Sequence, residues 1–132
     1  MSGTIRVGLA DDDSLSRMAL SSILEHASGI DVAWTATNGQ LALEAALADP
    51  VDVILMDVQM PVLDGITATR AIRALDDPRR ARTPIIAITA HALRGDAERL
   101  VAAGMNAYLS KPIAGDELVD LVERLAAPAE VS

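Results

Sequence analysis

Strand-like and helix-like stretches alternate along the whole chain, and this alternation constrains the fold more than any other feature. Runs rich in aliphatic residues predict strands at Ile5–Ala10, Ile30–Ala36, Val51–Met56, Pro84–Thr89 and Ala107–Ser110. Apolar residues at helical spacing predict helices at Ser14–Ala27, Asn38–Ala48, Asp64–Leu75 and Asp116–Leu125, and a further helix marked by Leu93, Ala97, Leu100 and Val101 that ends at Gly104. Strict alternation of five strands with five helices favours a parallel sheet with helices on both faces, the doubly wound α/β class.

The predicted strands differ in their apolar content, and the difference indicates their places in the sheet. Val51–Met56 is almost continuously apolar, as expected for a central strand that is covered on both faces. Ile30–Ala36 alternates apolar with polar or small residues, which is typical of a half-exposed edge strand. Asp13 or Ser14 is expected to be the N-cap of the first helix.

Composition excludes several classes of site. The 132 residues correspond to one domain at the usual size of about 150 residues per domain. The chain has no cysteine, which excludes disulfides, thiolate metal sites and cysteine nucleophiles. The net charge of −8 argues against direct nucleic-acid binding, and the one basic cluster, Arg79-Arg80-Arg82, is interpreted as a solvated loop. Because no signal peptide or membrane-length apolar run is evident, a cytoplasmic location is expected.

Carboxylate, hydroxyl or ammonium side chains stand at the ends of four of the five predicted strands. They are Asp11, Asp12 and Asp13 after the first strand, Asp57 at the end of the third, Thr89 at the end of the fourth and Lys111 after the fifth. Ligands of open parallel sheets bind beyond the carboxyl ends of the strands. The strand order 2-1-3-4-5 would bring these four strand ends together and leave the second strand aside.

Carboxylates that converge on one crevice repel one another. Either one of them takes up a proton at a raised pKa, or a divalent cation with oxygen ligands neutralises them. Mg²⁺ suits a site of carboxylates, a carbonyl, water and a phosphate. With Lys111, the only lysine, and the Thr89 hydroxyl, the set has the parts needed for phosphoryl transfer to an aspartate, here Asp57. For a single aspartate a helix cap is the simpler interpretation, and Asp13 is expected to be one.

Beyond these single residues, five short motifs occur in order along the chain. They are Ala10-Asp11-Asp12-Asp13, Met56-Asp57-Val58-Gln59-Met60-Pro61, Leu63-Asp64-Gly65, Thr89-Ala90-His91 and Tyr108-Leu109-Ser110-Lys111-Pro112. With them the chain resembles the receiver domain of two-component response regulators, most closely receivers of hybrid histidine kinases or stand-alone regulators. The resemblance implies a flavodoxin-like (βα)5 fold with residues 1–127 as the receiver domain. Residues 128–132 are then a short tail without an output domain.

The resemblance implies a metal-dependent phosphoacceptor. Asp57 is the implied acceptor of the phosphoryl group, and Mg²⁺ is the implied cofactor. Asp12, Asp57 and the backbone carbonyl of Gln59 are implied to bind the metal directly, and Asp11 through water. The family pattern also implies a cis peptide bond at Lys111–Pro112.

The remaining implied roles concern the phosphoryl group and the switch. Lys111 and Thr89 are implied to contact the phosphoryl group, and Gln59 and His91 to tune its lifetime. Tyr108 is implied to change rotamer and to reshape the face of the fourth helix, the fifth strand and the fifth helix, where partners dock. The implied donor is a histidine kinase or a histidine phosphotransfer protein, and the domain is implied to catalyse its own phosphorylation and dephosphorylation rather than to act as an enzyme on other substrates.

Three other functions fit parts of the sequence. A degenerate receiver would bind partners without phosphorylation, but the Asp, Thr and Lys set is intact. A haloacid-dehalogenase-like phosphatase would place a second aspartate as general acid where Gln59 stands. A flavodoxin-like FMN module would need a Ser/Thr-rich phosphate loop where Asp11-Asp12-Asp13 stands.

One departure from the family pattern concerns packing. Gly8 stands where the family usually has a β-branched residue, which predicts looser packing of the first strand. Trp34 is expected to lie half-buried on the sheet surface.

Overall fold

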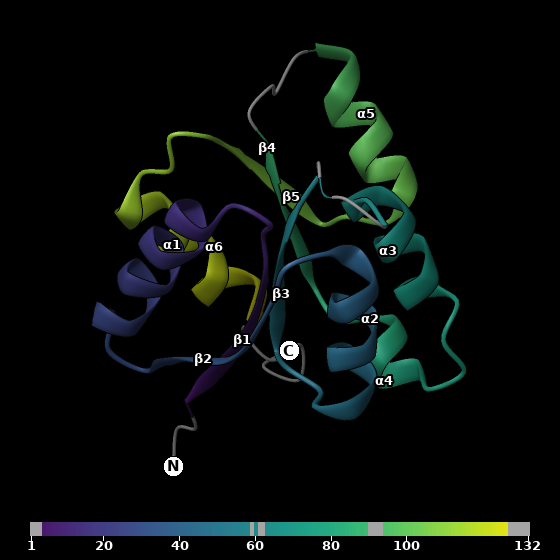
Figure 1. Ribbon diagram of the computed structural model, residues 1–132, viewed down its shortest axis with the longest axis horizontal. Coiled ribbons are helices and arrows are strands. Elements are labelled where there is room, and N and C mark those ends of the chain that lie inside the picture. The colour runs from purple at the N-terminus through teal and green to yellow at the C-terminus, as the bar shows by residue number, and fades with distance from the viewer. Residues whose placement is uncertain (1–3, 59, 61–62, 90–93, 127–132) are drawn as a thin grey trace.

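The computed structural model describes residues 4–58, 60, 63–89 and 94–126. Their five strands form one parallel sheet in the order β2-β1-β3-β4-β5, as predicted (Figure 1). The strands are β1 (Ile5–Ala10), β2 (Ile30–Ala36), β3 (Val53–Asp57), β4 (Ile85–Thr89) and β5 (Ala107–Ser110). All residues of β3 and β4 are buried, whereas the middle of β2 is partly exposed, as expected for central strands and an edge strand.

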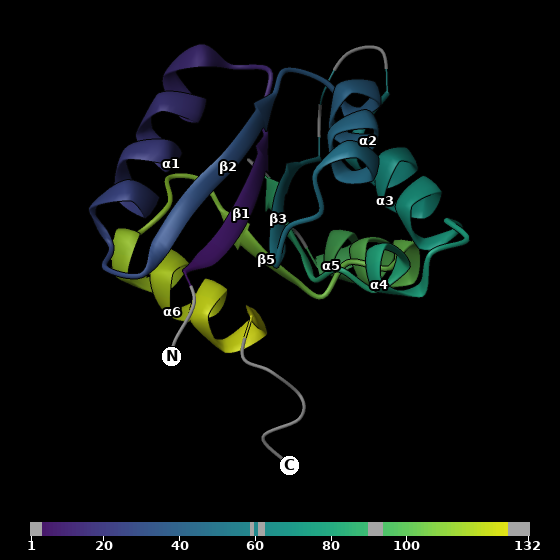
Figure 2. The ribbon, with the colours of Figure 1, turned by 90° about the horizontal axis from the view of Figure 1, so that it is seen from below.

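The helices cover the sheet on both faces. They are α1 (Ser14–His26), α2 (Gly39–Ala48), α3 (Gly65–Arg73), α4 (Pro78–Ala81), α5 (Arg94–Ala103) and α6 (Gly115–Ala126). Figure 2 shows α1 and α6 on one face and α2, α3 and α5 on the other. Each face has its own buried cluster, with Leu24 and Leu118 in one and Ala68 and Leu100 in the other. No helix in the described ranges is long and apolar enough to span a bilayer.

Local capping explains where the helices begin. Asp13, the N-cap of α1, accepts a hydrogen bond from the Leu15 N–H, which confirms its predicted role. Asn38 and Asp64 cap α2 and α3 in the same way. Of these helices, α1 begins close to Asp11 after β1, and α3 begins close to Asp57 at the end of β3.

The interpretation of the basic cluster as a loop was wrong in part. Residues Pro78–Ala81 form the four-residue helix α4. Asp77 starts it by accepting from the Arg79 N–H at 2.9 Å, and Pro78 takes the first helical position, where its missing N–H costs nothing.

The prediction of loose packing at Gly8 was also wrong. A β-carbon at this position would lie 2.3 Å from Cζ2 of Trp34, so the indole occupies the space that a side chain would take. Trp34 is partly buried, and its Nε1 donates to the carbonyl of Asp49 at 3.1 Å. Gly8 thus makes room for an aromatic ring of the neighbouring strand, and the β1–β2 register shifts between Val7 and Gly8.

Candidate functional site

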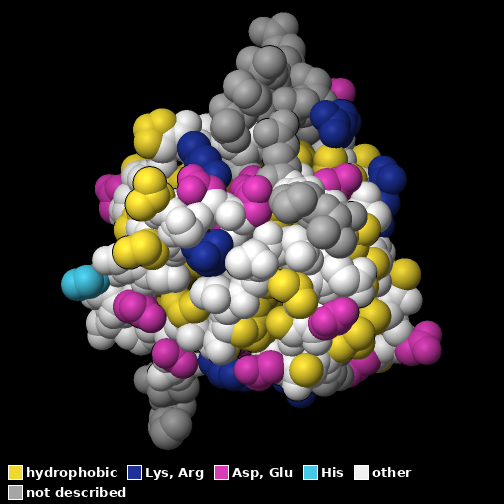
Figure 3. Space-filling model, viewed as in Figure 1, with side chains coloured by type: hydrophobic (Ala, Val, Ile, Leu, Met, Phe, Trp, Pro, Cys, Tyr) yellow, Lys and Arg dark blue, Asp and Glu magenta, His cyan; other side chains and the backbone are white. Residues whose placement is uncertain are grey.

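The carboxyl ends of β1 and β3 bring three carboxylates together. Asp11 follows β1 and Asp57 ends β3, and both are buried, whereas Asp12 is exposed. Their carboxylate oxygens lie within 4.8 Å of one another. On this face Figure 3 shows acidic side chains across the middle, with hydrophobic side chains beside them over α1. The predicted cluster of strand-end aspartates therefore exists in the fold.

Lys111, which directly follows β5, brings a positive charge to this cluster. Its Nζ lies 3.5 Å from Oδ2 of Asp11 and 3.7 Å from Oδ2 of Asp57. The Lys111 N–H donates to the carbonyl of Thr89 at 2.9 Å, and the Lys111–Pro112 peptide is cis, as expected. One cation thus faces two buried carboxylates and leaves an excess of negative charge.

A short hydrogen-bonded turn positions the first two carboxylates. The Asp11 N–H donates to the Ala36 carbonyl at 3.0 Å, and the Asp13 N–H donates to Oδ1 of Asp11 at 2.9 Å. Arg17 reaches back from α1, and its Nη1 donates to the carbonyl of Asp11 at 2.8 Å. Sequence reasoning missed Arg17, although an arginine in the first turn of a helix that follows three aspartates was a visible signal.

The loop after Asp57 is closed by a glycine at the start of α3. The Gly65 N–H donates to the Val58 carbonyl at 3.0 Å. A β-carbon on Gly65 would lie 2.3 Å from the Asp57 carbonyl oxygen, so only glycine lets α3 begin this close to the strand end. Met60, two residues beyond Val58, is buried in the core.

Thr89 and Tyr108 lie on β4 and β5, the two strands that follow β3 in the order of the sheet. Thr89 ends β4 and is buried, and β4 pairs with β3 so that Asp57 stands opposite Ile88. Tyr108 lies on β5 and is 41% exposed. The two predicted tuning residues, Gln59 and His91, lie outside the described residues.

This set of donors fits a hard divalent cation. All three groups are carboxylates, two of them are buried, and Lys111 offsets only part of their charge. Mg²⁺ prefers oxygen ligands and commonly binds through one or two carboxylates, with water and phosphate oxygens completing its shell. The site can therefore hold such an ion next to a carboxylate that is able to act as a nucleophile.

Comparison of the sequence with known proteins finds clear relatives. The family model for the response regulator receiver domain matches residues 7–123. Signal transduction histidine-protein kinase BarA of Escherichia coli K12 is 48% identical over 87 residues, which cover 66% of this chain but only 9% of BarA. Polar-differentiation response regulator DivK of Brucella anthropi is 35% identical over 117 residues, which cover 89% of this chain and 92% of DivK.

A solved structure shows the likeness in three dimensions. The receiver domain of sensor histidine kinase PA1611 from Pseudomonas aeruginosa PAO1 has a TM-score of 0.85 and 37% sequence identity to this chain. The match covers 96% of this chain and 100% of that domain. That structure holds a magnesium ion coordinated in its active site cleft.

Proposed function

Because this chain belongs to the response regulator receiver domain family of two-component systems, we propose that it accepts a phosphoryl group from a phosphohistidine on Asp57 and changes its docking surface in response. Receiver domains are phosphoacceptors rather than classical enzymes. The observation that carries the proposal is the arrangement of three carboxylates within 4.8 Å and Lys111 Nζ 3.7 Å from Asp57. Residues 1–127 are the proposed extent of the domain, and the cytoplasm is its proposed location.

Asp11, Asp12 and Asp57, with the backbone carbonyl of Gln59, are the proposed holders of Mg²⁺. When bound, the ion neutralises charge on the phosphoryl oxygens. The magnesium ion in the receiver domain of PA1611 supports this assignment. The short distances between the carboxylates in this chain support it independently, because Lys111 offsets only part of the repulsion among three carboxylates so close together.

The proposed transfer is an in-line displacement at phosphorus. A carboxylate oxygen of Asp57 forms the new P–O bond while the P–N bond to the donor imidazole breaks, and the bonding pair leaves with the imidazole nitrogen. Lys111 holds its ammonium beside the charge of the transferred group, and the Thr89 hydroxyl donates to one of its oxygens. Attack of water on the same phosphorus returns Asp57 to its free form, with Gln59 and His91 as the proposed residues that set the lifetime.

The test of the function is phosphorylation by a small donor. Incubation with acetyl phosphate and Mg²⁺ is expected to add one phosphoryl group, visible by intact mass and released by hydroxylamine, as an acyl phosphate requires. Chelation of Mg²⁺ with EDTA should prevent the adduct. A protein that shows neither an adduct nor a response to beryllofluoride would instead be a receiver that binds partners without phosphorylation.

Binding of Mg²⁺ is also expected to stabilise the fold. An ion that binds only the folded state adds about 2.7 kcal/mol at 100 times its dissociation constant. Thermal unfolding followed by circular dichroism, at constant ionic strength, should therefore shift upward in millimolar Mg²⁺. The Asp12→Asn variant loses one proposed ligand and should show a smaller shift, and an unchanged melting curve of the wild type would contradict the proposed site.

The phosphodonor protein must cover the rim of this site, because its histidine has to reach the buried Asp57. Leu15 and Met18 lie on α1, one turn apart and close to the carboxylates in sequence, and they are 74% and 68% exposed. Exposed apolar side chains beside a reactive site are typical of a protein interface. We therefore expect the donor to pack on these two residues.

This docking predicts a selective defect. Leu15→Gln and Met18→Gln are expected to slow transfer from a phosphorylated donor protein by about tenfold each, within the range of interface truncations. Phosphorylation by acetyl phosphate should not change, because the small donor needs no docking surface. Val101→Gln removes another exposed apolar side chain, 64% exposed on α5, and is the matched control. Equal transfer rates for all variants would contradict the docking surface.

The proposed output surface does not include Leu15 and Met18 and is formed by α5, β5 and α6. Two exposed apolar side chains support it, Val101 on α5 and Tyr108 on β5. Thr89 and Tyr108 lie on neighbouring paired strands, since β4 and β5 pair with Ala87 opposite Tyr108. A shift of Thr89 toward a phosphoryl group would therefore change the packing next to Tyr108.

A further inference from the structure

We propose that Arg17 is a positioning residue for the metal site: its guanidinium holds the backbone of the turn that presents Asp11 and Asp12, and so sets the affinity of the site for a divalent cation. The inference rests on the proposed function and extends it to a residue outside the carboxylate cluster. Within the described part of the chain, the hydrogen bonds of Arg17 go to the backbone carbonyls of Asp11 and Asp13 rather than to carboxylate oxygens, so its role is exerted through the turn.

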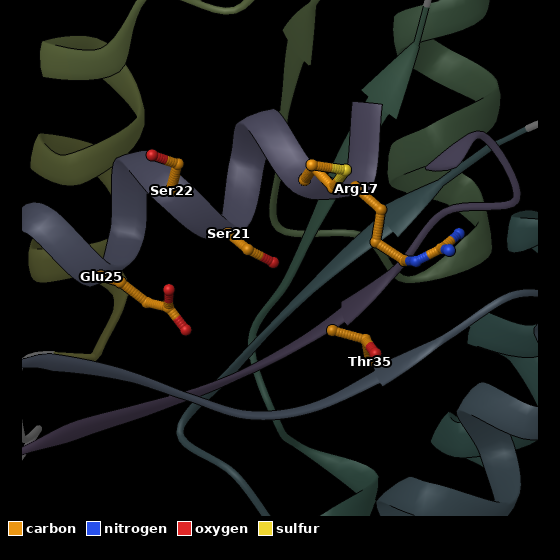
Figure 4. A pocket seen from close by; sticks show the side chains of 6 residues that line it. Arg17, Ser21, Ser22, Glu25 and Thr35 are labelled. Atoms are coloured by element: carbon orange, nitrogen blue, oxygen red, sulfur yellow. The ribbon is translucent and has the colours of Figure 1, made fainter. Parts of the chain in front are cut away.

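The Arg17 side chain runs back from α1 toward the carboxyl end of β1 (Figure 4). Its Nη1 donates to the Asp11 carbonyl at 2.8 Å, and its backbone N–H donates to the Asp13 carbonyl at 2.9 Å. Arg17 therefore binds both ends of the turn from Asp11 to Asp13. The side chain holds the first end and the backbone holds the second.

The bond to the Asp11 carbonyl fixes the peptide group that joins Asp11 to Asp12. The Asp11 N–H is already held by the carbonyl of Ala36 at 3.0 Å. With Arg17 on its carbonyl, Asp11 is bonded on both sides, and the peptide plane that leads into Asp12 can no longer rotate freely. This matters most for Asp12, because it is exposed and has little packing to orient its side chain.

The nearby carboxylates attract a positive charge, but the dipole of α1 does not favour an arginine at this position. The first turn of a helix carries a partial positive charge, which disfavours a cation there, and α1 has no acidic residue in its first turn. A fixed positive charge close to the carboxylates would also weaken the attraction of a second cation. The hydrogen bond to Asp11 supplies the missing reason.

A purely electrostatic role and a positioning role of Arg17 predict opposite changes in Mg²⁺ affinity when the side chain is removed. If Arg17 acted only through its charge, its removal would tighten Mg²⁺ binding, most strongly at low salt. If Arg17 positions the turn, its removal weakens binding at every salt concentration. Residues that orient metal ligands from outside the first shell typically change metal affinity by about 10–100-fold.

The structure also indicates that variants at this position can fold. Arg17 is only partly buried, and its side chain lines an open hollow of about 370 Å³ between α1 and β2. Met18, Glu25 and Thr35 are among the other lining residues. A methionine at position 17 keeps the apolar stem against this hollow and removes only the charge and the donors.

The test is isothermal titration of Mg²⁺ into metal-free wild type, Arg17→Met and Arg17→Lys at two salt concentrations. We expect the dissociation constant to rise about tenfold for Arg17→Met and less for Arg17→Lys, which retains one donor and the charge. Arg124→Met removes the same charge from the exposed side of α6, where Arg124 pairs with Asp120 at 3.1 Å, and is expected to bind like wild type.

A second measurement separates positioning from general stability. In the metal-free protein, exchange of the Asp13 amide with solvent, followed by NMR, should accelerate in Arg17→Met and not in Arg124→Met. If Arg17→Met does not fold, Arg17→Gln takes its place, because glutamine is too short to reach the same carbonyl. Equal or tighter Mg²⁺ binding by the folded variant would overturn the role of Arg17, whereas absence of Mg²⁺ binding by the wild type would overturn the metal site itself.

Discussion

Asp57→Asn is expected to abolish phosphorylation by acetyl phosphate while the fold stays intact. An amide of the same shape fills the same volume at the end of β3, but it has no carboxylate oxygen to form the acyl phosphate. Intact mass after incubation with acetyl phosphate and Mg²⁺ should show one adduct on the wild type and none on the variant.

The same variant is expected to be at least as stable as the wild type when Mg²⁺ is absent. Asp11 and Asp57 are both buried with carboxylate oxygens within 4.8 Å. Two unit charges at this distance repel by about 3 kcal/mol at an effective dielectric constant of 20, and Lys111 offsets part of that energy. Removing one charge therefore raises the melting temperature of the metal-free protein and reduces the additional rise that Mg²⁺ produces.

Asp120→Asn is the matched control for both measurements. Asp120 is exposed on α6, far along the chain from the cluster, and its change removes the same charge. This variant should be phosphorylated like the wild type and should respond to Mg²⁺ in full. An adduct that persisted on Asp57→Asn would mean that another residue is the acceptor, and a destabilised metal-free variant would mean that the carboxylates do not repel as argued.

The central and edge positions of two strands could be predicted because burial in a parallel sheet leaves a direct mark on the sequence, and the polar strand ends then favoured the order 2-1-3-4-5. A strand covered on both faces must be apolar at consecutive positions, as in Val53–Met56, whereas the edge strand Ile30–Ala36 alternates. Once the order is known, the geometry of a parallel sheet brings Asp11 and Asp57 together at the carboxyl ends of the strands. The carboxylate cluster therefore follows from two local patterns.

Three features escaped prediction, each for a different physical reason. Nothing near Gly8 in the chain indicates that the ring of Trp34 fills its place, because the two residues meet only through strand pairing. The short helix α4 depends on one capping bond from Asp77, a signal too local to separate from a turn. Arg17 is visible as an arginine close behind three aspartates, but its partner is a backbone carbonyl, and the sequence does not indicate which carbonyl a side chain will reach.

Arg73 is a second arginine that binds backbone carbonyls, and it lies at the amino ends of β4 and β5. Its Nε and Nη2 both donate to the Gly104 carbonyl, at 2.9 and 2.7 Å, and its Nη1 donates to the carbonyls of Ala81 and Thr83 at 3.0 and 2.7 Å. Nη2 also donates to Oδ1 of Asn106 at 2.8 Å. The guanidinium thus joins the end of α3 to the segments that lead into β4 and β5.

The cation in this junction is held by neutral acceptors. Burial lowers the pKa of Arg73 from its ordinary value, because the charged form loses part of its hydration. The group still stays protonated at neutral pH, since an arginine does not lose its proton in a protein. Five charge-assisted hydrogen bonds to carbonyl and amide oxygens replace the lost water.

Arg73→Met is therefore expected to destabilise the fold by about 3 kcal/mol, because it leaves several partly buried carbonyls without a donor. For a domain of this size such a loss lowers the melting temperature by roughly 10 °C. Arg73→Lys should recover only part of it, since one ammonium cannot reproduce a planar fork of donors. Arg70→Met, an exposed arginine in the last turn of the same helix, is the control and should change stability by less than about 0.5 kcal/mol.

The position of Arg73 also predicts what should not change. Arg73 ends α3, whereas Gly65 begins the same helix beside Asp57. The junction therefore lies at the amino ends of the strands and the phosphorylation site at their carboxyl ends. Well below its melting temperature, Arg73→Met should accept a phosphoryl group from acetyl phosphate at the rate of the wild type. Urea unfolding and labelling by intact mass measure the two properties separately. A free energy of unfolding within about 1 kcal/mol of the wild-type value would contradict the junction's role in stability. A labelling defect in the folded variant would show that the junction and the phosphorylation site are coupled.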